Sequence, residues 1–434
     1  MKKIYKEILK AIIPSMLATL FTGFYIIVDG FFIGQKLGDI GLAAINIAWP
    51  IAAFIQALGI AIGTACGILL KKHLTLKDEE GVRKTYLSTI YILIFFVLIC
   101  FLISFFRDKL LYLIGANFET IELASLYIKF YLYSSLIVVF ASAILPVLRN
   151  NGHYKKAALI MTLGTAINFI LDYLFIYRLE IGLKGAALAS VISQFVILIL
   201  GIIILIKNKQ IILKTNLDFK VIVTLLRKGV APFILTFSAA LIIIFYNKFC
   251  FAYGGNDTIA AYTVLAYIIY LPQYIAIGIG EGIQPVLTEH HTLQDKELKK
   301  YFYHTFLILV LLLVLMTILF AFLRQKLGYL FNLNEAAFTA YKEAYFYFIL
   351  SFIFVGIIRI YASLFEATSQ IIKADIIVLV EPLLTPLLLL IFTNYLATKG
   401  IWIAYLIIQI ILALSSFLIK NINIKSCNKN TEEI

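Results

Sequence analysis

Long apolar stretches dominate this sequence and leave few folds open to it. Each stretch is long enough to cross a bilayer as a helix, which takes roughly 20 residues. Transmembrane β-strands would instead alternate in hydrophobicity over about ten residues. We therefore predict an all-α integral membrane protein with twelve transmembrane helices. They cover residues 12–34, 40–70, 86–106, 123–148, 157–179, 184–206, 229–253, 258–288, 301–323, 338–368, 374–397 and 400–420.

The composition agrees, with 62% hydrophobic and only 14% charged residues, where a soluble domain has about 25% charged. The first stretch lacks a signal-peptide cleavage site and carries Asp29, so we expect it to stay in the protein. The cysteines lie too far apart for a metal site or a disulfide framework, which favours a packing role. They are Cys66, Cys100, Cys250 and Cys427.

The net charge of +13 reports topology rather than nucleic-acid binding. With a cytoplasmic N-terminus, 25 of the 37 Lys and Arg residues lie in cytoplasmic tails and loops, and 10 lie on the other side. The remaining two, Lys248 and Arg359, lie within spans. This is the positive-inside bias. We expect a multi-pass protein of the plasma (inner) membrane, with both termini cytoplasmic and with contacts to membrane lipid.

The sequence repeats itself at an offset of half its length. Residues 73–80 and 290–297 are identical at five of eight positions, and Gly63 aligns with Gly280. We therefore predict an N-lobe (1–210) and a C-lobe (211–434), joined by a basic linker at about 207–228. Because six spans is an even number, the lobes are parallel repeats, and transporters of this kind hold substrate in a central cleft between lobes. A duplication with a purely structural role is the weaker alternative.

Both repeated segments contain a histidine five residues before an aspartate, as His73–Asp78 and His290–Asp295. Some acyltransferases use such a pair. Here both copies fall in charged loops, so helix capping or a solvated loop is favoured over catalysis. The sequence shows no other catalytic motif, and we do not expect an enzyme.

Two aspartates lie inside spans of the N-lobe, Asp29 and Asp172. Such charges are costly in hydrocarbon and usually functional. The predicted orientation brings both to a similar depth, with Ser190 at that level and Asn168 one turn before Asp172 on the same face. Two carboxylates in low dielectric cannot both stay ionised without a partner, so the pair would take up H⁺ or bind Na⁺. Two unrelated aspartates at local kinks are the alternative.

Charges within the C-lobe spans differ from this pattern. Glu281, Arg359, Glu366 and Glu381 all lie toward the inner side. Glu281 has no acidic counterpart in the first half, and binding of a substrate cation and pairing with Arg359 are equally open to it. Gln284, one turn later, is a further candidate for the substrate cleft.

Aromatic residues form 15% of the chain, with 26 tyrosines. A cleft of aromatic rings and acids suits lipophilic organic cations. Tyr25 and Tyr173 are candidates, although many such rings pack or lie at the membrane interface. Pro14 is the expected hinge near the aspartate pair.

Four segments resemble the multidrug and toxic compound extrusion (MATE) family of cation-coupled antiporters. They are residues 29–44, residues 148–157, residues 168–190, and residues 278–285 with Gly278, Gly280, Gln284 and Pro285. The resemblance covers the whole chain, with twelve spans and the expected break between lobes. In the branch of the family with an N-lobe aspartate pair, Asp29 and Asp172 match the cation-coupling acids and Asn168 matches their companion. The residues at 246–248 (Tyr-Asn-Lys) lack the acid that other branches use in the seventh span.

The resemblance implies a secondary antiporter that exports amphipathic, cationic, drug-like compounds by alternating access. It implies H⁺ or Na⁺ as coupling ion, no cofactor, and a monomer. A lipid-linked-oligosaccharide or lipid flippase of related fold is the main alternative, but such clefts carry clustered bases, and the N-lobe spans hold acids instead. A channel is disfavoured because no ring of pore-lining charges is evident.

Overall fold

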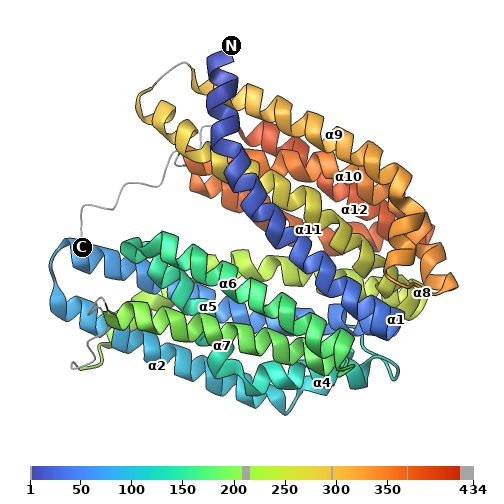
Figure 1. Cartoon of the computed structure of the whole chain (residues 1–434), viewed down its shortest axis with the longest axis horizontal. Coiled ribbons are helices and arrows are strands. Elements are labelled where there is room, and N and C mark those ends of the chain that lie inside the picture. The colour runs from blue at the N-terminus through green and yellow to red at the C-terminus, as the bar shows by residue number, and fades with distance from the viewer. Residues whose placement is uncertain (1, 208–215, 295–296, 369, 421–434) are drawn as a thin grey trace. The chain divides into compact units, whose positions relative to one another are not determined.

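The computed structural model describes residues 2–207, 216–294, 297–368 and 370–420, and within these ranges the chain is all-helical (Figure 1). Two π-helical segments, η1 and η2, interrupt the α-helices. The elements are α1 (Lys2–Thr75), α2 (Glu79–Ser104), α3 (Arg107–Ile114), α4 (Ile121–Tyr133), α5 (Ser135–Leu148), η1 (Arg149–His153), α6 (Tyr154–Asp172), η2 (Tyr173–Arg178), α7 (Leu183–Lys207), α8 (Phe219–Thr292), α9 (Leu298–Leu330), α10 (Glu335–Ala367), α11 (Ile371–Leu396) and α12 (Thr398–Lys420).

Ten helices among the described residues are long and apolar enough to cross a membrane. Two of them, α1 and α8, are 74 residues long, and each contains two of the expected spans. The helices therefore account for the twelve predicted spans. The fourth span, 123–148, consists of α4 and α5, which meet at Ser134.

The internal repeat is confirmed in the backbone. Within α1 the non-helical residue is Gly38 (φ 62°, ψ −157°), and within α8 it is Gly255 (φ 64°, ψ −158°). Half the chain length separates these two glycines, and the same offset separates Lys2 and Phe219, where α1 and α8 begin. Glycine adopts a positive φ without steric cost, whereas a residue with a β-carbon would be strained in this backbone conformation. The shared glycine thus joins the first two spans of each half in the same way.

The chain forms two compact units, Val28–Ala260 and Met1–Ile27 with Ala261–Ile434. This division differs from the lobe boundary near residue 210 that the sequence predicts, and the two-lobe assignment remains a prediction. The first arm of α8 groups with residues from the first half of the sequence. The first arm of α1 groups with the second half.

Specific contacts hold the first arm of α8 within the unit Val28–Ala260. The side chains of Asn46 and Asn247 are buried, and Asn46 Nδ2 donates to Asn247 Oδ1 at 2.8 Å. Asn247 Nδ2 returns a bond to the Asn46 carbonyl oxygen at 3.0 Å. Phe54 packs edge-on against Phe233, with ring centroids 5.9 Å apart. An amide pair that satisfies itself can be buried where a single amide would be costly.

The first arm of α1 makes corresponding contacts within its own unit. The hydroxyl of Tyr5 lies 3.0 Å from His304 Nδ1 on α9. The hydroxyl of Thr19 donates to the Tyr274 carbonyl oxygen on α8 at 2.8 Å. Each half of the sequence therefore gives its first arm to a unit made mostly of the other half.

Close helix packing fills the interior of each unit. In the unit Val28–Ala260, α7 packs against α4, α5 and α6. In the other unit, α12 packs against α10 and α11, and the buried ring of Phe348 stacks on Tyr405 at 4.2 Å. Small residues permit the closest approaches in membrane helices. A β-carbon at Gly63 would lie only 2.2 Å from the Ala143 carbonyl oxygen.

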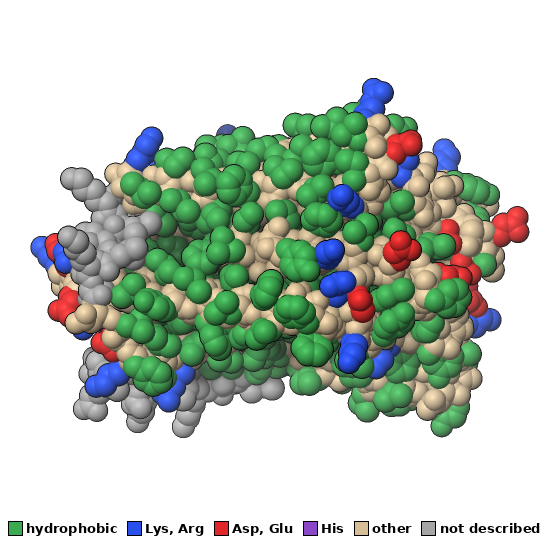
Figure 2. All heavy atoms as spheres, turned by 90° about the horizontal axis from the view of Figure 1, so that it is seen from below, with side chains coloured by type: hydrophobic (Ala, Val, Ile, Leu, Met, Phe, Trp, Pro, Cys, Tyr) green, Lys and Arg blue, Asp and Glu red, His purple; other side chains and the backbone are tan. Residues whose placement is uncertain are grey.

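The molecular surface is that of a membrane protein. Hydrophobic side chains cover most of the face shown in Figure 2, and charged side chains gather toward the ends. Exposed apolar side chains include Leu98, Leu311 and Leu315, which are 56%, 56% and 63% exposed. A protein with such an apolar surface would aggregate in water, whereas a bilayer requires apolar side chains where the protein faces lipid.

Candidate cation-coupling site

The predicted acid pair lies within one compact unit. Asp29 lies in α1, before Gly38, and Asp172 is the last residue of α6. The side chains of Asp172 and Asn168 are buried, with residue exposures of only 2% and 4%. The π-helical segment η2 begins at the next residue, Tyr173. Such interruptions of α-helices are frequent at functional sites, and this one marks the predicted acid.

Asp29 and Asp172 lie close enough to interact electrostatically. The buried hydroxyl of Tyr131, on α4, also lies in the field of both carboxylates. Tyr131 is hydrogen-bonded with Ser190 on α7 and with Tyr127 one turn earlier. The structure therefore brings Asp29, Asp172 and Ser190 together from three helices, as the span orientations predict.

Several polar atoms of this group are buried without a hydrogen-bond partner among the described residues. They are one carboxylate oxygen of Asp29, both carboxylate oxygens of Asp172, and the amide nitrogen of Asn168. A buried polar group that lacks a partner costs about 1–3 kcal/mol, and proteins retain few of them. A binding site for H⁺ or a hard cation requires such unpartnered oxygen atoms close together.

Nearby basic side chains are engaged elsewhere. Lys36 Nζ lies 2.6 Å from Glu180 Oε1 and 4.7 Å from the centre of the Tyr177 ring. Arg178 Nε donates to the Tyr173 hydroxyl at 2.9 Å. Within the described ranges, neither carboxylate of the pair forms an ion pair with a lysine or arginine. The described residues therefore supply no basic side chain that would neutralise this pair when it is ionised.

The candidates for substrate contact fall in both units. The ring of Tyr173 is 38% exposed and stacks on Tyr177 at 5.7 Å, at the end of α6 rather than among the buried carboxylates. The side chain of Tyr25 lies outside the described residues. Pro14 is exposed, and the helix continues through it, since the non-helical residue of α1 is Gly38. Both the aromatic candidates and the proline hinge remain predictions.

Glu281 and Gln284 lie on α8 in the other unit. Gln284 Nε2 lies 3.4 Å from Glu366 Oε2, and Glu281 and Asp375 lie near the same carboxylate. Arg359 has Glu381 near it, and Gln409 Nε2 donates to Glu381 Oε1 at 2.7 Å. Acids therefore gather around Glu366, and both readings of Glu281 stay open.

Sequence reasoning missed Tyr131 and Tyr127. They lie four residues apart on one face of α4, with ring centroids 5.2 Å apart. The available signal was a pair of tyrosines one helical turn apart in a span that packs on Ser190. Many tyrosine pairs in membrane helices only pack together, so the pattern alone does not select these two.

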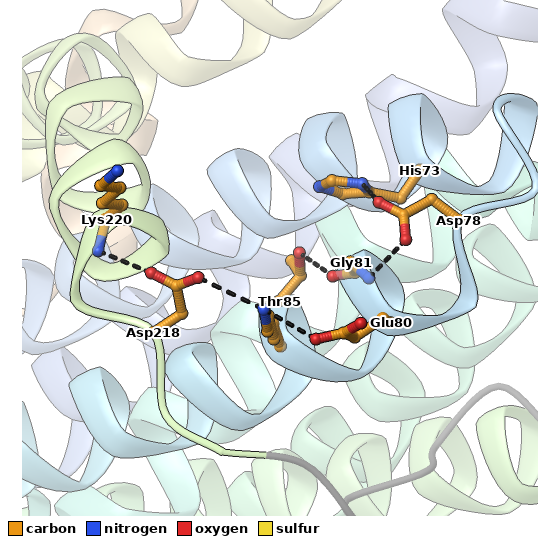
Figure 3. Close-up of polar contacts among 8 residues, drawn as sticks. His73, Asp78, Glu80, Gly81, Thr85, Asp218 and Lys220 are labelled. Carbon is orange, nitrogen blue, oxygen red and sulfur yellow. Dashed lines mark hydrogen bonds and ion pairs between the residues drawn. The ribbon is translucent and has the colours of Figure 1, made fainter.

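The histidine–aspartate motif is a helix cap, as the sequence favours. Asp78 Oδ1 accepts a hydrogen bond from the Gly81 backbone N–H at 2.9 Å, and His73 Nδ1 lies 2.8 Å from Asp78 Oδ2 (Figure 3). Asp78 is the N-cap residue of α2, where a carboxylate satisfies a free backbone donor. In the second copy, Asp295 lies outside the described residues.

The end of the linker attaches beside this cap. Asp218 lies directly before α8 and forms an ion pair with Lys84 of α2 at 3.5 Å. Lys84 also pairs with Glu80 at 2.8 Å, and Figure 3 shows this chain of contacts next to the His73–Asp78 pair. The repeated segment is thus a structural junction.

Comparison with known proteins finds similarity to one family of transporters. The MatE family model matches residues 14–174, which contain Asp29, Asn168 and Asp172. The multidrug export protein MepA of Staphylococcus saprophyticus is 26% identical over 96% of this chain and 93% of its own length. MepA of Staphylococcus aureus (strain NCTC 8325 / PS 47) is 24% identical over the same shares. Over nearly its whole length the chain is therefore similar to MATE multidrug transporters.

Solved structures agree in fold. The inward-facing conformation of a multidrug resistance MATE transporter is 21% identical, with a TM-score of 0.82 over 92% of this chain and 93% of that chain. The outward-facing conformation of a multidrug resistance MATE transporter gives a TM-score of 0.71 over 96% of this chain and 94% of that chain. A third structure is that of a MOP superfamily transporter from Pyrococcus furiosus, with a TM-score of 0.70 and 22% identity over 96% of this chain and 94% of that chain. Its description states that "reverse polarity of binding pocket suggests different function". This MATE fold therefore occurs with binding pockets of different polarity.

Proposed function

We propose that this chain is a MATE-family multidrug exporter that works as a cation-coupled antiporter. Inward flow of H⁺ or Na⁺ would drive the export of amphipathic organic cations. The observation that carries this proposal is the buried group around Asp29 and Asp172, in which one carboxylate oxygen of Asp29 and both of Asp172 lack partners among the described residues. The relatives named above are export proteins for multiple drugs, which supports the same class of substrate.

The chemistry of the site supports coupling to a cation. Two carboxylates that lie near each other in a buried, low-dielectric setting repel one another when both are ionised. A proton would remove one charge, and Na⁺ would be held by carboxylate oxygens together with the amide oxygen of Asn168 and the hydroxyl of Ser190. Either ion changes the balance of forces among α1, α6 and α7. A change of this kind can favour one state of the transporter over another.

The wider assignment follows the repeat and the charge bias. Residues 1–210 would form the N-lobe and residues 211–434 the C-lobe, which rock around a substrate in alternating access. The excess of basic residues on one side would place both termini in the cytoplasm, with the protein in the plasma membrane as a monomer. Tyr25, Tyr173, Glu281 and Gln284 would contact substrate, and Pro14 would bend the first span.

A flippase for lipid-linked oligosaccharides is the second candidate, because a protein of the same fold carries a pocket of reversed polarity. Such a substrate is anionic and would need basic side chains in the cleft. The buried carboxylates disfavour it, since they would repel a pyrophosphate group. Acids in a membrane interior indicate a cationic partner instead.

Dye efflux with separate H⁺ and Na⁺ gradients tests the proposal. Cells that produce the wild-type protein should extrude ethidium, and Asp29→Asn and Asp172→Asn should each lower the initial rate of extrusion about 100-fold. Imposing either gradient on energy-depleted cells then identifies the coupling ion. Wild-type efflux by either variant would exclude the acid pair as the coupling site.

A matched control removes a carboxylate elsewhere. Glu122→Gln neutralises an exposed acid on α4, the helix that also carries Tyr131, and should leave efflux unchanged. Gel filtration of each purified variant separates loss of coupling from loss of folding. Asp172→Glu, which keeps the charge, should retain part of the activity.

A further inference from the structure

A large cavity lies in the unit that contains α9, α10 and α12. Its volume is about 870 Å³, within the 300–1,000 Å³ of small-molecule sites. Aromatic rings form one wall: Phe302, Phe306, Tyr361 and Phe417 all lie within 6.2 Å of a neighbouring ring. Tyr303 and Leu418 at the rim are 62% and 67% exposed. The cavity is thus apolar inside and continuous with an apolar outer surface.

Basic groups accompany this apolar wall. His291 at the end of α8 and Lys299 in the first turn of α9 line the cavity and are exposed. Lys373 of α11 is only 5% exposed, with Nζ 5.6 Å from the centre of the Phe365 ring, which also lines the cavity. No carboxylate in the described ranges lies within 4 Å of Lys373 Nζ or Lys299 Nζ. A buried ammonium without a carboxylate indicates an anionic partner.

The neighbouring acids do not change this charge pattern. Glu297, directly before α9, pairs with Lys300 at 3.1 Å. Glu366 is exposed and accepts from Gln284 of α8, and it does not line the cavity. The cavity wall therefore has a positive edge, which would repel the organic cations proposed as transport substrates.

The first half of the sequence has no such cavity wall. The positions equivalent to Phe302, Phe306, Tyr361 and Phe365 in the first copy of the repeat are Thr85, Thr89, Ile144 and Leu148, and all four are buried. A β-carbon at Gly201 would lie 2.7 Å from Ile144 Cδ1, which shows how tightly this region is filled. The aromatic cavity is therefore not a by-product of the shared scaffold.

We propose that this cavity binds an anionic phospholipid. One acyl chain would lie along the aromatic wall, and the phosphate would contact Lys299 and His291, with Lys373 adding positive potential. Exposed apolar residues at the rim favour a lipid over free phosphate, since they need the hydrocarbon chain for cover. The cavity lies among helix ends that the positive-inside bias assigns to the cytoplasm, so the lipid would come from the inner leaflet, an assignment that rests on the proposed orientation.

Native mass spectrometry of the purified protein tests the proposal. The protein is incubated in detergent with equimolar dioleoyl-phosphatidylglycerol and dioleoyl-phosphatidylcholine. Wild type should retain phosphatidylglycerol in preference. Lys299→Gln should weaken phosphatidylglycerol binding about fivefold, because one basic residue near an anionic headgroup contributes about that factor. Leu418→Glu at the rim should weaken it further, through repulsion.

Lys300→Gln is the matched control, since Lys300 neighbours Lys299 but pairs with Glu297 and does not line the cavity. It should bind like wild type, and excess inorganic phosphate should not displace the lipid. Equal retention of the two lipids by wild type, or equal loss in Lys299→Gln and Lys300→Gln, would overturn the proposal. Displacement by phosphate would also overturn it, by identifying an anion site without lipid. None of these readouts involves transport, so the proposed antiport is tested separately.

Discussion

At Asp172 the first half of the sequence buries a carboxylate, whereas the equivalent position in the second half is the fully buried Leu389. Other polar residues near Asp172 are also replaced by less polar ones in the second half. Tyr131 corresponds to Phe348, which lacks the hydroxyl, and Asn168 corresponds to Thr385. Phe348 stacks on Tyr405, and the Thr385 hydroxyl donates to the Glu381 carbonyl oxygen of its own helix at 2.8 Å. The scaffold thus carries a buried acid in one half, whereas the equivalent positions in the other half are apolar or hydrogen-bonded within their own helix.

This difference has an energetic reason. A helix scaffold can be duplicated at no cost in buried charge, but a second buried acid pair would cost several kcal/mol again. At the place of Asp29 the second half has Tyr246, followed by Asn247, whose amide is satisfied by Asn46. The duplicated position therefore contributes to packing within its unit rather than to ion binding.

The largest effect should come from removing the acid pair, singly or together. If the pair binds one ion as a unit, Asp29→Asn/Asp172→Asn should transport no worse than either single variant, with each about 100-fold below wild type, the equivalent of about 2.7 kcal/mol. The measurement is the initial rate of ethidium efflux at fixed expression. If the efflux rate of the double variant falls by the product of the two single losses, the acids act separately.

The next effect concerns packing at two equivalent glycines. A β-carbon at Gly63 would meet the rigid backbone of Ala143 at 2.2 Å, whereas one at Gly280 would meet the Ser363 hydroxyl, which can rotate away. Gly63→Ala should therefore destabilise the protein by about 1–3 kcal/mol, and Gly280→Ala should cost less. Thermal unfolding of both variants in detergent measures the difference. A larger loss in Gly280→Ala would show that the halves pack differently from this structure.

A smaller effect separates the polar companions. Asn168→Ala should reduce efflux about tenfold, which corresponds to losing one hydrogen bond to a charged group or ion. Thr385→Ala at the equivalent position should change efflux less than about twofold, since its hydroxyl only bonds its own helix. Equal losses in the two variants would contradict the asymmetry of the halves.

The smallest effect lies in the repeated loop. The Gly81 N–H and the His73 side chain hold the pKa of Asp78 below its ordinary value. A lowered folded-state pKa adds stability above the unfolded value of about 3.9, and this stability is lost as pH falls through the folded pKa. Wild type should therefore exceed Asp78→Asn in melting temperature at pH 6, with the gap closing below about pH 4. A constant gap would mean that charge plays no part, and Glu79→Gln serves as the exposed control.

Sequence reasoning could place the candidate residues near one another where helix geometry is regular, and their role stays a prediction. Asn168 and Asp172 share a face because four residues make about one turn, and the spans of Asp29 and Ser190 could be oriented from basic residues in the loops. The substrate contacts could not be fixed in this way. Tyr173 and Tyr25 were selected for proximity in sequence, and the structure places the Tyr173 ring in a surface stack with Tyr177.

The amino-acid sequence by itself determined the membrane-embedded helical class, the twelve spans and the repeat of one half in the other, because apolar length and periodicity are local properties. It also identified both acids, since a charge in an apolar run is evident without coordinates. Only the tertiary structure showed that α1 and α8 each give their first arm to the other half, that Tyr131 joins the acid pair, and that aromatic rings form one wall of a cavity in one half. These features depend on contacts between residues far apart in the chain, which no local pattern encodes.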